Sequence, residues 1–134
     1  MSERIEGRVE EIVAAPNYAT VSIPRADGSV QSVVAWADAE DGNVTLNSAI
    51  GRAWPANLRK AGRATVTILA DSNPYEWVAI EAKLAEATTD GADAHIDSLA
   101  HKYLGVDSYP YRQPDEKRIK LTLSPERIHY VKQG

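Results

Sequence analysis

The sequence predicts a mainly β fold of the α+β class, built from antiparallel strands with a few short helices. Apolar and polar residues alternate over Arg63–Asp71 and again over Tyr75–Ala87, which is the period of a half-buried strand. Asp27-Gly28 and Asp41-Gly42 separate extended stretches and are typical of hairpin turns. The chain has 134 residues, so we expect one domain that covers residues 1–134.

The N-terminal part predicts one helix and three strands. Ser2–Ala14 carries apolar residues at helical spacing, with Ser2 as a suitable cap. Extended segments follow at Ala19–Pro24 and Val30–Asp38, and a third strand begins at Asn43. Because a short polar turn separates each strand from the next, we expect these three strands to form an antiparallel meander.

The third strand runs directly into a short helix. Pro55 is tolerated only in a first helical turn, so the helix should begin close to Arg52 and end at Ala61-Gly62. Free backbone amides, the helix dipole and a guanidinium would then meet at one point, which suits a phosphate monoester. An ordinary strand-to-helix turn with a solvated arginine is the alternative. The polar and small residues delivered there are Asn47, Ser48, Gly51 and Arg52.

The long strand predicted over Tyr75–Ala87 is apolar on both faces near its start. Val78 and Ile80 share one face, which can fill the interior of a barrel. Tyr75 and Trp77 share the other face and must meet something else. We therefore expect a partner subunit or a flat ligand on that face.

A helix and an irregular loop are expected next. Thr89 or Asp90 caps a helix that runs to about Tyr103, because one stripe of this segment is apolar and Gly105 follows. The loop 106–115 contains the run YPYR, cannot continue the helix, and should lie across a surface.

The C-terminal residues predict two strands joined by a turn. Lys117–Leu123 alternates between apolar and polar residues, and Ile128–Val131 forms a last short strand. The proline-containing segment Ser124–Arg127 is expected to be the turn between them.

Composition narrows the classes of function. The net charge of −4 argues against nucleic-acid and anionic-membrane partners. Cys is absent, and neither a signal peptide nor a spanning segment is visible, so we expect a cytoplasmic protein that acts on a small molecule. His95 and His101 project to different faces of their predicted helix, which predicts surface or interface histidines and no metal site. The sequence contains no nucleophile elbow, Walker loop or paired carboxylates, so no catalytic residue is assigned.

Five stretches, in this order and spacing, carry a resemblance to a known family: PNYATVSIPRADGSVQSVVAW, NSAIGRAWPANL, NPYEWVAIEAKL, HIDSLAHKYLGVDSYPYR and LSPERIHYV. They extend over nearly the whole chain, which resembles the FMN-binding split β-barrel, or pyridoxamine-phosphate-oxidase-like, superfamily. Within it the chain looks most like the F420-dependent flavin/deazaflavin oxidoreductases. The resemblance implies a homodimeric split β-barrel. The basic C-terminal substrate motif of the pyridoxamine-phosphate oxidases is absent, which argues against that activity.

The resemblance implies that the phosphate of FMN or F420 binds at the strand-to-helix turn. An asparagine that matches Asn57 supports the helix in family members. Many relatives carry a lysine, as a second phosphate cation, where this chain has Trp54, and this departure bears on the choice of cofactor. The candidate residues in and beside the turn are Asn47, Ser48, Ala49, Gly51 and Arg52.

The resemblance further implies that the isoalloxazine-like ring lies against the second strand, whose backbone groups reach its polar edge. The opposite subunit usually closes such a site. A plain core strand, and tryptophans packed in the dimer interface, remain the alternatives. The candidates are Ser32, Val33, Val34, Ala35 and Trp36 on the strand, and, from the opposite subunit, Trp77 and the YPYR loop Tyr109–Arg112, with Tyr109 and Arg112 as its contacts.

The function expected from this resemblance is hydride transfer between F420 and an unsaturated, conjugated organic substrate. A hydride carrier brings the reaction chemistry itself, so the missing acid/base pair is no objection. An FMN-dependent oxidoreductase is the first alternative. A protein that binds a flavin or deazaflavin without turning it over is the second.

Overall fold

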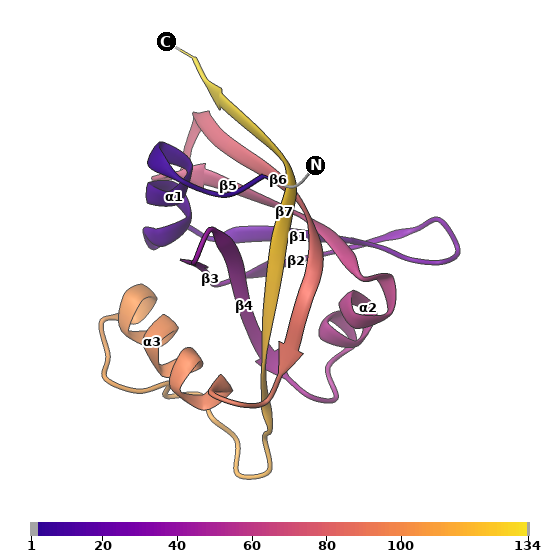
Figure 1. Cartoon of the computed structure of the whole chain (residues 1–134). Coiled ribbons are helices and arrows are strands. Elements are labelled where there is room, and N and C mark those ends of the chain that lie inside the picture. The colour runs from indigo at the N-terminus through magenta and orange to yellow at the C-terminus, as the bar shows by residue number, and fades with distance from the viewer. Residues whose placement is uncertain (1–2, 134) are drawn as a thin grey trace.

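The computed structural model describes residues 3–133 and contains one antiparallel sheet with three helices (Figure 1). The spatial order of the strands is β2-β1-β5-β6-β7-β4-β3. In chain order the elements are α1 (Gly7–Ala14), β1 (Ala19–Pro24), β2 (Val30–Ala35), β3 (Ala37–Glu40), β4 (Asn43–Ala49), α2 (Ala53–Ala61), β5 (Arg63–Ala70), β6 (Asn73–Thr88), α3 (Ala92–Leu104) and β7 (Arg118–Lys132).

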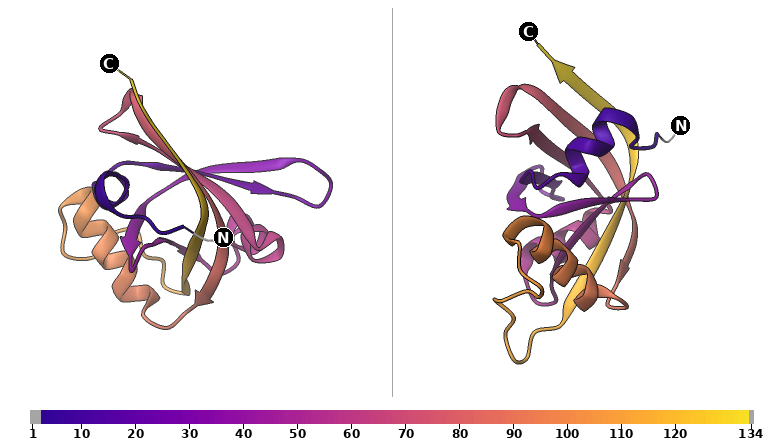
Figure 2. Two further views of the ribbon diagram at one scale, coloured as in Figure 1. Left: turned by 45° about the horizontal axis from the view of Figure 1, so that its top comes forward. Right: turned by 90° about the vertical axis from the view of Figure 1, so that its left-hand side faces the viewer.

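The two edge strands of the sheet are neighbours in the sequence. β2 ends at Ala35 and β3 begins at Ala37, so only Trp36 separates the two edges. The sheet must therefore curl until its edges approach each other, as Figure 2 shows from two sides. The prediction of one strand over Val30–Asp38 was wrong, and so was the meander. The hairpins at Asp27-Gly28 and Asp41-Gly42 are confirmed, but they lie at opposite edges of the sheet.

Side chains of α3 hold the break between β2 and β3. The Tyr103 hydroxyl donates to the Asn17 carbonyl at 2.6 Å and accepts the Ala37 amide at 3.1 Å. Lys102 Nζ donates to the carbonyls of Val13 and Ala37. Side chains of α3 thus hold the backbone at Ala37. At this point the chain stops pairing with β1 and begins to pair with β4.

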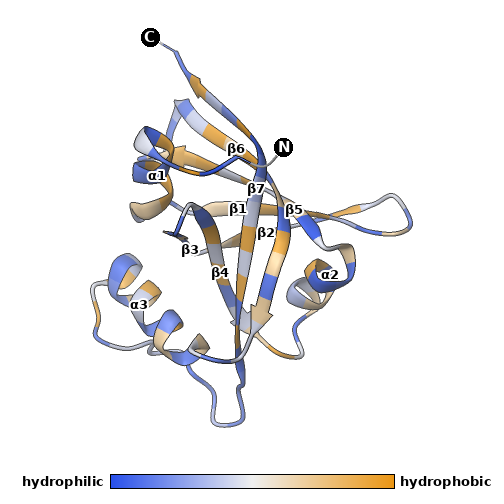
Figure 3. Ribbon diagram, in the orientation of Figure 1, coloured by the Kyte–Doolittle hydropathy of each residue, from blue (hydrophilic) through white to orange (hydrophobic). Residues whose placement is uncertain are grey.

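Side chains on the inward face of each strand fill the interior of the curled sheet. In β5 burial alternates residue by residue, as the sequence predicted, and inward residues include Val66 and Ile68. β4 is buried almost throughout because α3 also packs against it. Figure 3 shows hydrophobic and hydrophilic residues interspersed along the strands. The largest fully buried side chains include Ile12, Ile23, Leu46, Leu58, Ile68, Ile80, Leu99, Leu121 and Leu123.

The helix after β4 has the bounds that its sequence predicts. α2 begins after Arg52, which is its N-cap, and places Pro55 in its first turn. It ends at Ala61, and Gly62 adopts the left-handed conformation with φ of 74°. A glycine is favoured there because a Cβ would crowd the following carbonyl.

The other two helices begin later than expected. α1 starts at Gly7, and the predicted cap, Ser2, lies outside the described residues. Gly91 is the N-cap of α3, and the Thr88 hydroxyl accepts the Asp90 amide instead of Thr89 or Asp90 capping the helix. No helix within residues 3–133 is long and apolar enough to cross a bilayer.

The predicted turn at Ser124–Arg127 is wrong, because β7 continues through it. Pro125 pairs with Ala82 where the register between β6 and β7 shifts, and a proline is tolerated at such an irregularity. Residue Glu3 adds two contacts at this point: its amide donates to the Pro125 carbonyl, and its carboxylate accepts the Ile128 amide at 2.8 Å. The N-terminal segment therefore replaces the missing ladder bonds.

An apolar row lies on the outer face of the sheet where β5, β6 and β7 meet. Trp77 pairs with Leu69 on one side and Val131 on the other, and Tyr75 near them is 61% exposed. We expect this row to bury itself against a second copy of the chain, since apolar surface favours association. Light scattering at micromolar concentration should then give twice the chain mass. Dimerisation stays a prediction, and a monomeric mass would contradict it.

Candidate functional site

A cleft of about 280 Å³ lies at the end of the sheet where β4 turns into α2. Several distant parts of the chain meet there: the segment before β1, the end of β2, the turn after β4, α3, the following loop and the start of β7. The lining residues are Tyr18, Val34, Ala35, Trp36, Asn47, Ser48, Arg52, Trp54, Ile96, Tyr109, Tyr111 and Arg118.

Ser48 contributes a buried hydroxyl that has no partner. The residue is 1% exposed, lines the cleft, and its Oγ makes no hydrogen bond within residues 3–133. A buried polar atom without a partner costs about 1–3 kcal/mol, so native structures rarely leave one. This hydroxyl is therefore the clearest sign in the cleft that a polar ligand belongs there.

The N-terminus of α2 supplies positive charge and free amides to the same cleft. No side chain caps this helix, and Arg52, its N-cap residue, lines the cleft. The Arg52 side chain is 52% exposed and makes one loose contact, at 3.5 Å, with Glu116. Gly51 precedes it with φ of 103°, a conformation that side chains rarely adopt. An anion could approach these groups without breaking a strong internal bond.

Asn47 is engaged by other residues of the chain. Its Oδ1 accepts Arg118 Nε at 2.9 Å, and its Nδ2 donates to the Ala92 carbonyl and to His95 Nδ1, each at 2.9 Å. Because the arginine can only donate, it sets the orientation of the amide. Both amide hydrogens are thus used within the protein, and Asn47 holds α3 against the cleft.

His95 was expected at the surface or in an interface, and within the chain it is half-buried. Its Nδ1 faces an amide donor, which requires the proton on Nε2, and Nε2 lies 3.2 Å from the Thr45 hydroxyl. Burial, together with the charge of Lys120, lowers the pKa of His95 to about 4. The imidazole is therefore neutral at physiological pH and links Asn47 to Thr45.

Protonation of His95 should destabilise the protein in acid. The unfolded chain binds the proton near pH 6.5, whereas the folded protein resists it until about pH 4, so the stability that His95 contributes is present above pH 6.5 and lost as pH falls toward 4. Thermal unfolding from pH 7 to pH 4 should show this loss. His95→Gln should flatten the profile, whereas His101→Gln, an exposed histidine on the same helix, should leave it unchanged.

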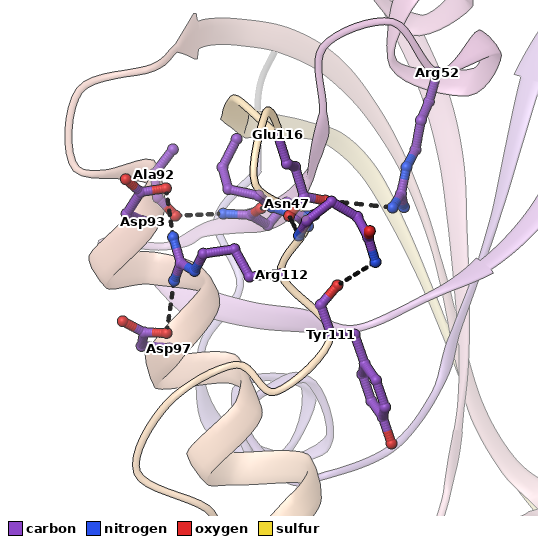
Figure 4. A network of polar contacts seen from close by, with 10 residues as sticks. Asn47, Arg52, Ala92, Asp93, Asp97, Tyr111, Arg112 and Glu116 are labelled. Atoms are coloured by element: carbon purple, nitrogen blue, oxygen red, sulfur yellow. Dashed lines mark hydrogen bonds and ion pairs between the residues drawn. The ribbon is translucent and has the colours of Figure 1, made fainter.

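A buried ion pair closes the β7 side of the cleft. Arg118 Nη1 lies 2.6 Å from Glu116 Oε1, and both side chains are almost fully buried. The Arg118 guanidinium also lies over the Tyr109 ring, 5.0 Å from its centroid. Figure 4 shows Arg52 reaching toward the same glutamate from the α2 side.

Aromatic rings form the opposite wall. The Trp36 ring stacks on Tyr103 at 5.2 Å with an interplanar angle of 7°, and Tyr109 meets it edge-on at 6.0 Å. Tyr111 in turn packs edge-on against Tyr109 at 5.8 Å. Trp36 is thus fixed from two sides and presents a rigid flat surface, of the kind on which a conjugated ring packs well.

The cleft brings together eight of the residues predicted from the sequence and leaves seven outside. Ala49 and Gly51 adjoin it along the chain. Trp77 lies on the outer face of the sheet, where only a second subunit could bring it to a cleft. The eight residues in the cleft are Val34, Ala35, Trp36, Asn47, Ser48, Arg52, Trp54 and Tyr109. Tyr109 lines the cleft of its own chain, whereas the prediction placed it on the opposite subunit.

The other four predicted residues have partners elsewhere. The Ser32 hydroxyl lies 3.2 Å from that of Ser22, and Val33 packs against the core. Asn57 donates to Gln31 at 2.7 Å and borders a separate hollow of about 590 Å³ between α2 and the β1–β2 turn. Arg112 pairs with Asp93 at 3.0 Å and with Asp97 at 2.9 Å, so it points at α3 (Figure 4).

Sequence reasoning missed three lining residues and the glutamate between the arginines. A further lining residue, Tyr111, belongs to the YPYR loop, which was a candidate as a whole. Tyr18 and Ile96 had no distinguishing pattern. Arg118 is the first residue of an alternating strand and follows Glu116 by two positions. A charged residue at an inward-facing position of such a strand is the one sequence signal that could have indicated Arg118.

The sequence matches no protein-family model and no curated protein. Its fold does match solved structures. An F420 reductase aligns with 93% of this chain and 98% of its own, at a TM-score of 0.79 and 16% identity. The conserved hypothetical protein Rv2991 from Mycobacterium tuberculosis aligns with 98% of this chain and 88% of its own, at 0.72 and 16%. A candidate pyridoxamine 5′-phosphate oxidase from Listeria innocua aligns with 87% and 89%, at 0.63 and 10%.

Proposed function

We propose that this split β-barrel protein is an F420-dependent oxidoreductase that transfers a hydride between the deazaflavin and an unsaturated, conjugated organic substrate. The observation that carries the proposal is the cleft itself. One wall carries the flat Trp36 ring with Tyr109 set edge-on against it, and the other end offers the Ser48 hydroxyl, which has no partner within residues 3–133, and a loosely held cation, Arg52. The fold of an F420 reductase over nearly the whole chain supports the choice.

The residues present fit such a cofactor. Arg52 and the uncapped amides of α2 would hold its phosphate, and the Ser48 hydroxyl would satisfy a polar atom beside it. Val34, Ala35 and Trp36 at the end of β2 would pack against the ring. When bound, F420 supplies the hydride chemistry, and the chain contributes positioning and exclusion of water.

Two alternatives follow from the same cleft. FMN also combines a flat ring with a phosphate, so an FMN-dependent oxidoreductase would use the same groups. A binding protein that holds either cofactor without turnover would need no more than the lining already described. These alternatives differ in cofactor preference and in turnover, so one set of measurements separates them.

Fluorescence titration of the purified protein with F420 and with FMN tests the proposal. We expect saturable binding of F420, and oxidation of reduced F420 when a conjugated unsaturated acceptor is added. Tighter binding of FMN with turnover would favour the first alternative. Binding of F420 without turnover of any acceptor tried would favour storage, and binding of neither cofactor would refute the proposal.

A further inference from the structure

Two arginines and one carboxylate set the charge of the cleft. Arg52 and Arg118 are its charged lining residues, and Glu116 Oε1 contacts both, at 3.5 Å and 2.6 Å. The Glu116 side chain is only 5% exposed, so water screens these contacts weakly. Arg112 is held by two aspartates of α3 and adds no free charge.

The charged side chains sum to one positive charge, and the N-terminus of α2 adds the partial positive charge of its dipole. A phosphate monoester such as FMN carries close to two negative charges at neutral pH, because its second pKa is about 6, whereas a phosphodiester carries one. A diester therefore balances the charged side chains, whereas the second negative charge of a monoester is opposed by the Glu116 carboxylate. The neighbouring lining residues Ser48 and Trp54 are neutral and do not change this sum.

We propose that Glu116 is a specificity residue that selects a singly charged phosphodiester over a doubly charged phosphate monoester. This inference rests on the proposed function, and it gives a physical reason why this part of the cleft would prefer the diester phosphate of F420 to the monoester phosphate of FMN. Glu116 Oε1 contacts both arginines, so an anion that binds to these arginines also meets the negative charge of this carboxylate. Like charges that share a partner at low solvent exposure are disfavoured.

The sharpest probes differ in phosphate charge alone. Dissociation constants of FMN and of its phosphate methyl ester, which keeps the same ring and side chain with one negative charge fewer, should be measured by calorimetry at pH 7.5, together with F420. We expect the wild-type protein to bind the methyl ester more tightly than FMN. Glu116→Gln keeps the shape and the hydrogen bond to Arg118, and should shift the ratio of the two constants about tenfold toward FMN.

A second variant is needed because Glu116→Gln changes a buried ion pair with Arg118, and misfolding of that variant would leave the ratio unmeasured. Trp54→Lys adds a cation to the cleft without touching the Glu116 pair, and should also shift the ratio toward FMN, less so at high salt. A wild-type preference for FMN, or variants that change both constants equally, would overturn the inference while leaving cofactor binding intact. If the wild-type protein binds none of the three ligands, the proposed function fails and this inference fails with it.

Discussion

Replacing Arg52 with alanine is expected to weaken binding of F420 by about ten- to a hundredfold. This change corresponds to the loss of one hydrogen bond to a charged group, which contributes roughly 1.5–3 kcal/mol. Arg52 is the lining cation whose internal contact is loose, at 3.5 Å, so its guanidinium is available to a phosphate. The other lining cation, Arg118, is held at 2.6 Å by Glu116 and at 2.9 Å by Asn47. Fluorescence titration of wild type and variant measures the change.

Arg59→Ala is the matched control for this experiment. Arg59 is an exposed arginine in the last turn of the same helix and does not line the cleft, so its loss should leave the dissociation constant unchanged. Unfolding of both variants should remain close to that of the wild type, because Arg52 makes only a loose contact at 3.5 Å and Arg59 is exposed. An unchanged dissociation constant for Arg52→Ala would show that Arg52 is merely solvated and that the phosphate binds elsewhere.

Tyr103→Phe should lower the free energy of unfolding by about 1–3 kcal/mol. The Tyr103 hydroxyl accepts the Ala37 amide and donates to the Asn17 carbonyl, so its removal leaves two backbone groups short of a partner at the break between β2 and β3. Urea denaturation followed by circular dichroism measures the change. The stacked Trp36 should also loosen, and cofactor affinity should fall with it.

Tyr18→Phe is the control for that prediction. The Tyr18 ring contacts the Tyr103 ring at 5.6 Å, but Tyr18 itself is 62% exposed. Loss of its hydroxyl should therefore leave the unfolding free energy within about 0.5 kcal/mol of the wild type. Equal stability of Tyr103→Phe and Tyr18→Phe would mean that solvent replaces the Tyr103 hydroxyl and that the break is held by other contacts.

The sequence predicted those residues of the candidate site that lie close together along the chain, at the turn from β4 to α2. Pro55 in a first turn and Gly62 as a C-cap placed α2 within a residue, and that placement delivered Ser48 and Arg52 to the cleft. Such signals are local, because they depend on the backbone preferences of a few adjacent residues. Asn47 belonged to the same stretch, yet its role differs, since its partners Ala92, His95 and Arg118 come from distant segments.

The alternating strands, the two Asp-Gly hairpins and the strand-to-helix turn follow from local sequence, because side-chain period and turn chemistry depend on a few adjacent residues. Where the strand pairing stops depends on contacts between distant segments. The break at Trp36 depends on Tyr103 of α3, and the continuity of β7 through Pro125 depends on Glu3. The charge of the cleft was likewise decided by residues brought together from far apart: Glu116 reaches both Arg118 and Arg52, and an electrostatic sum of this kind exists only once the fold has placed its members side by side.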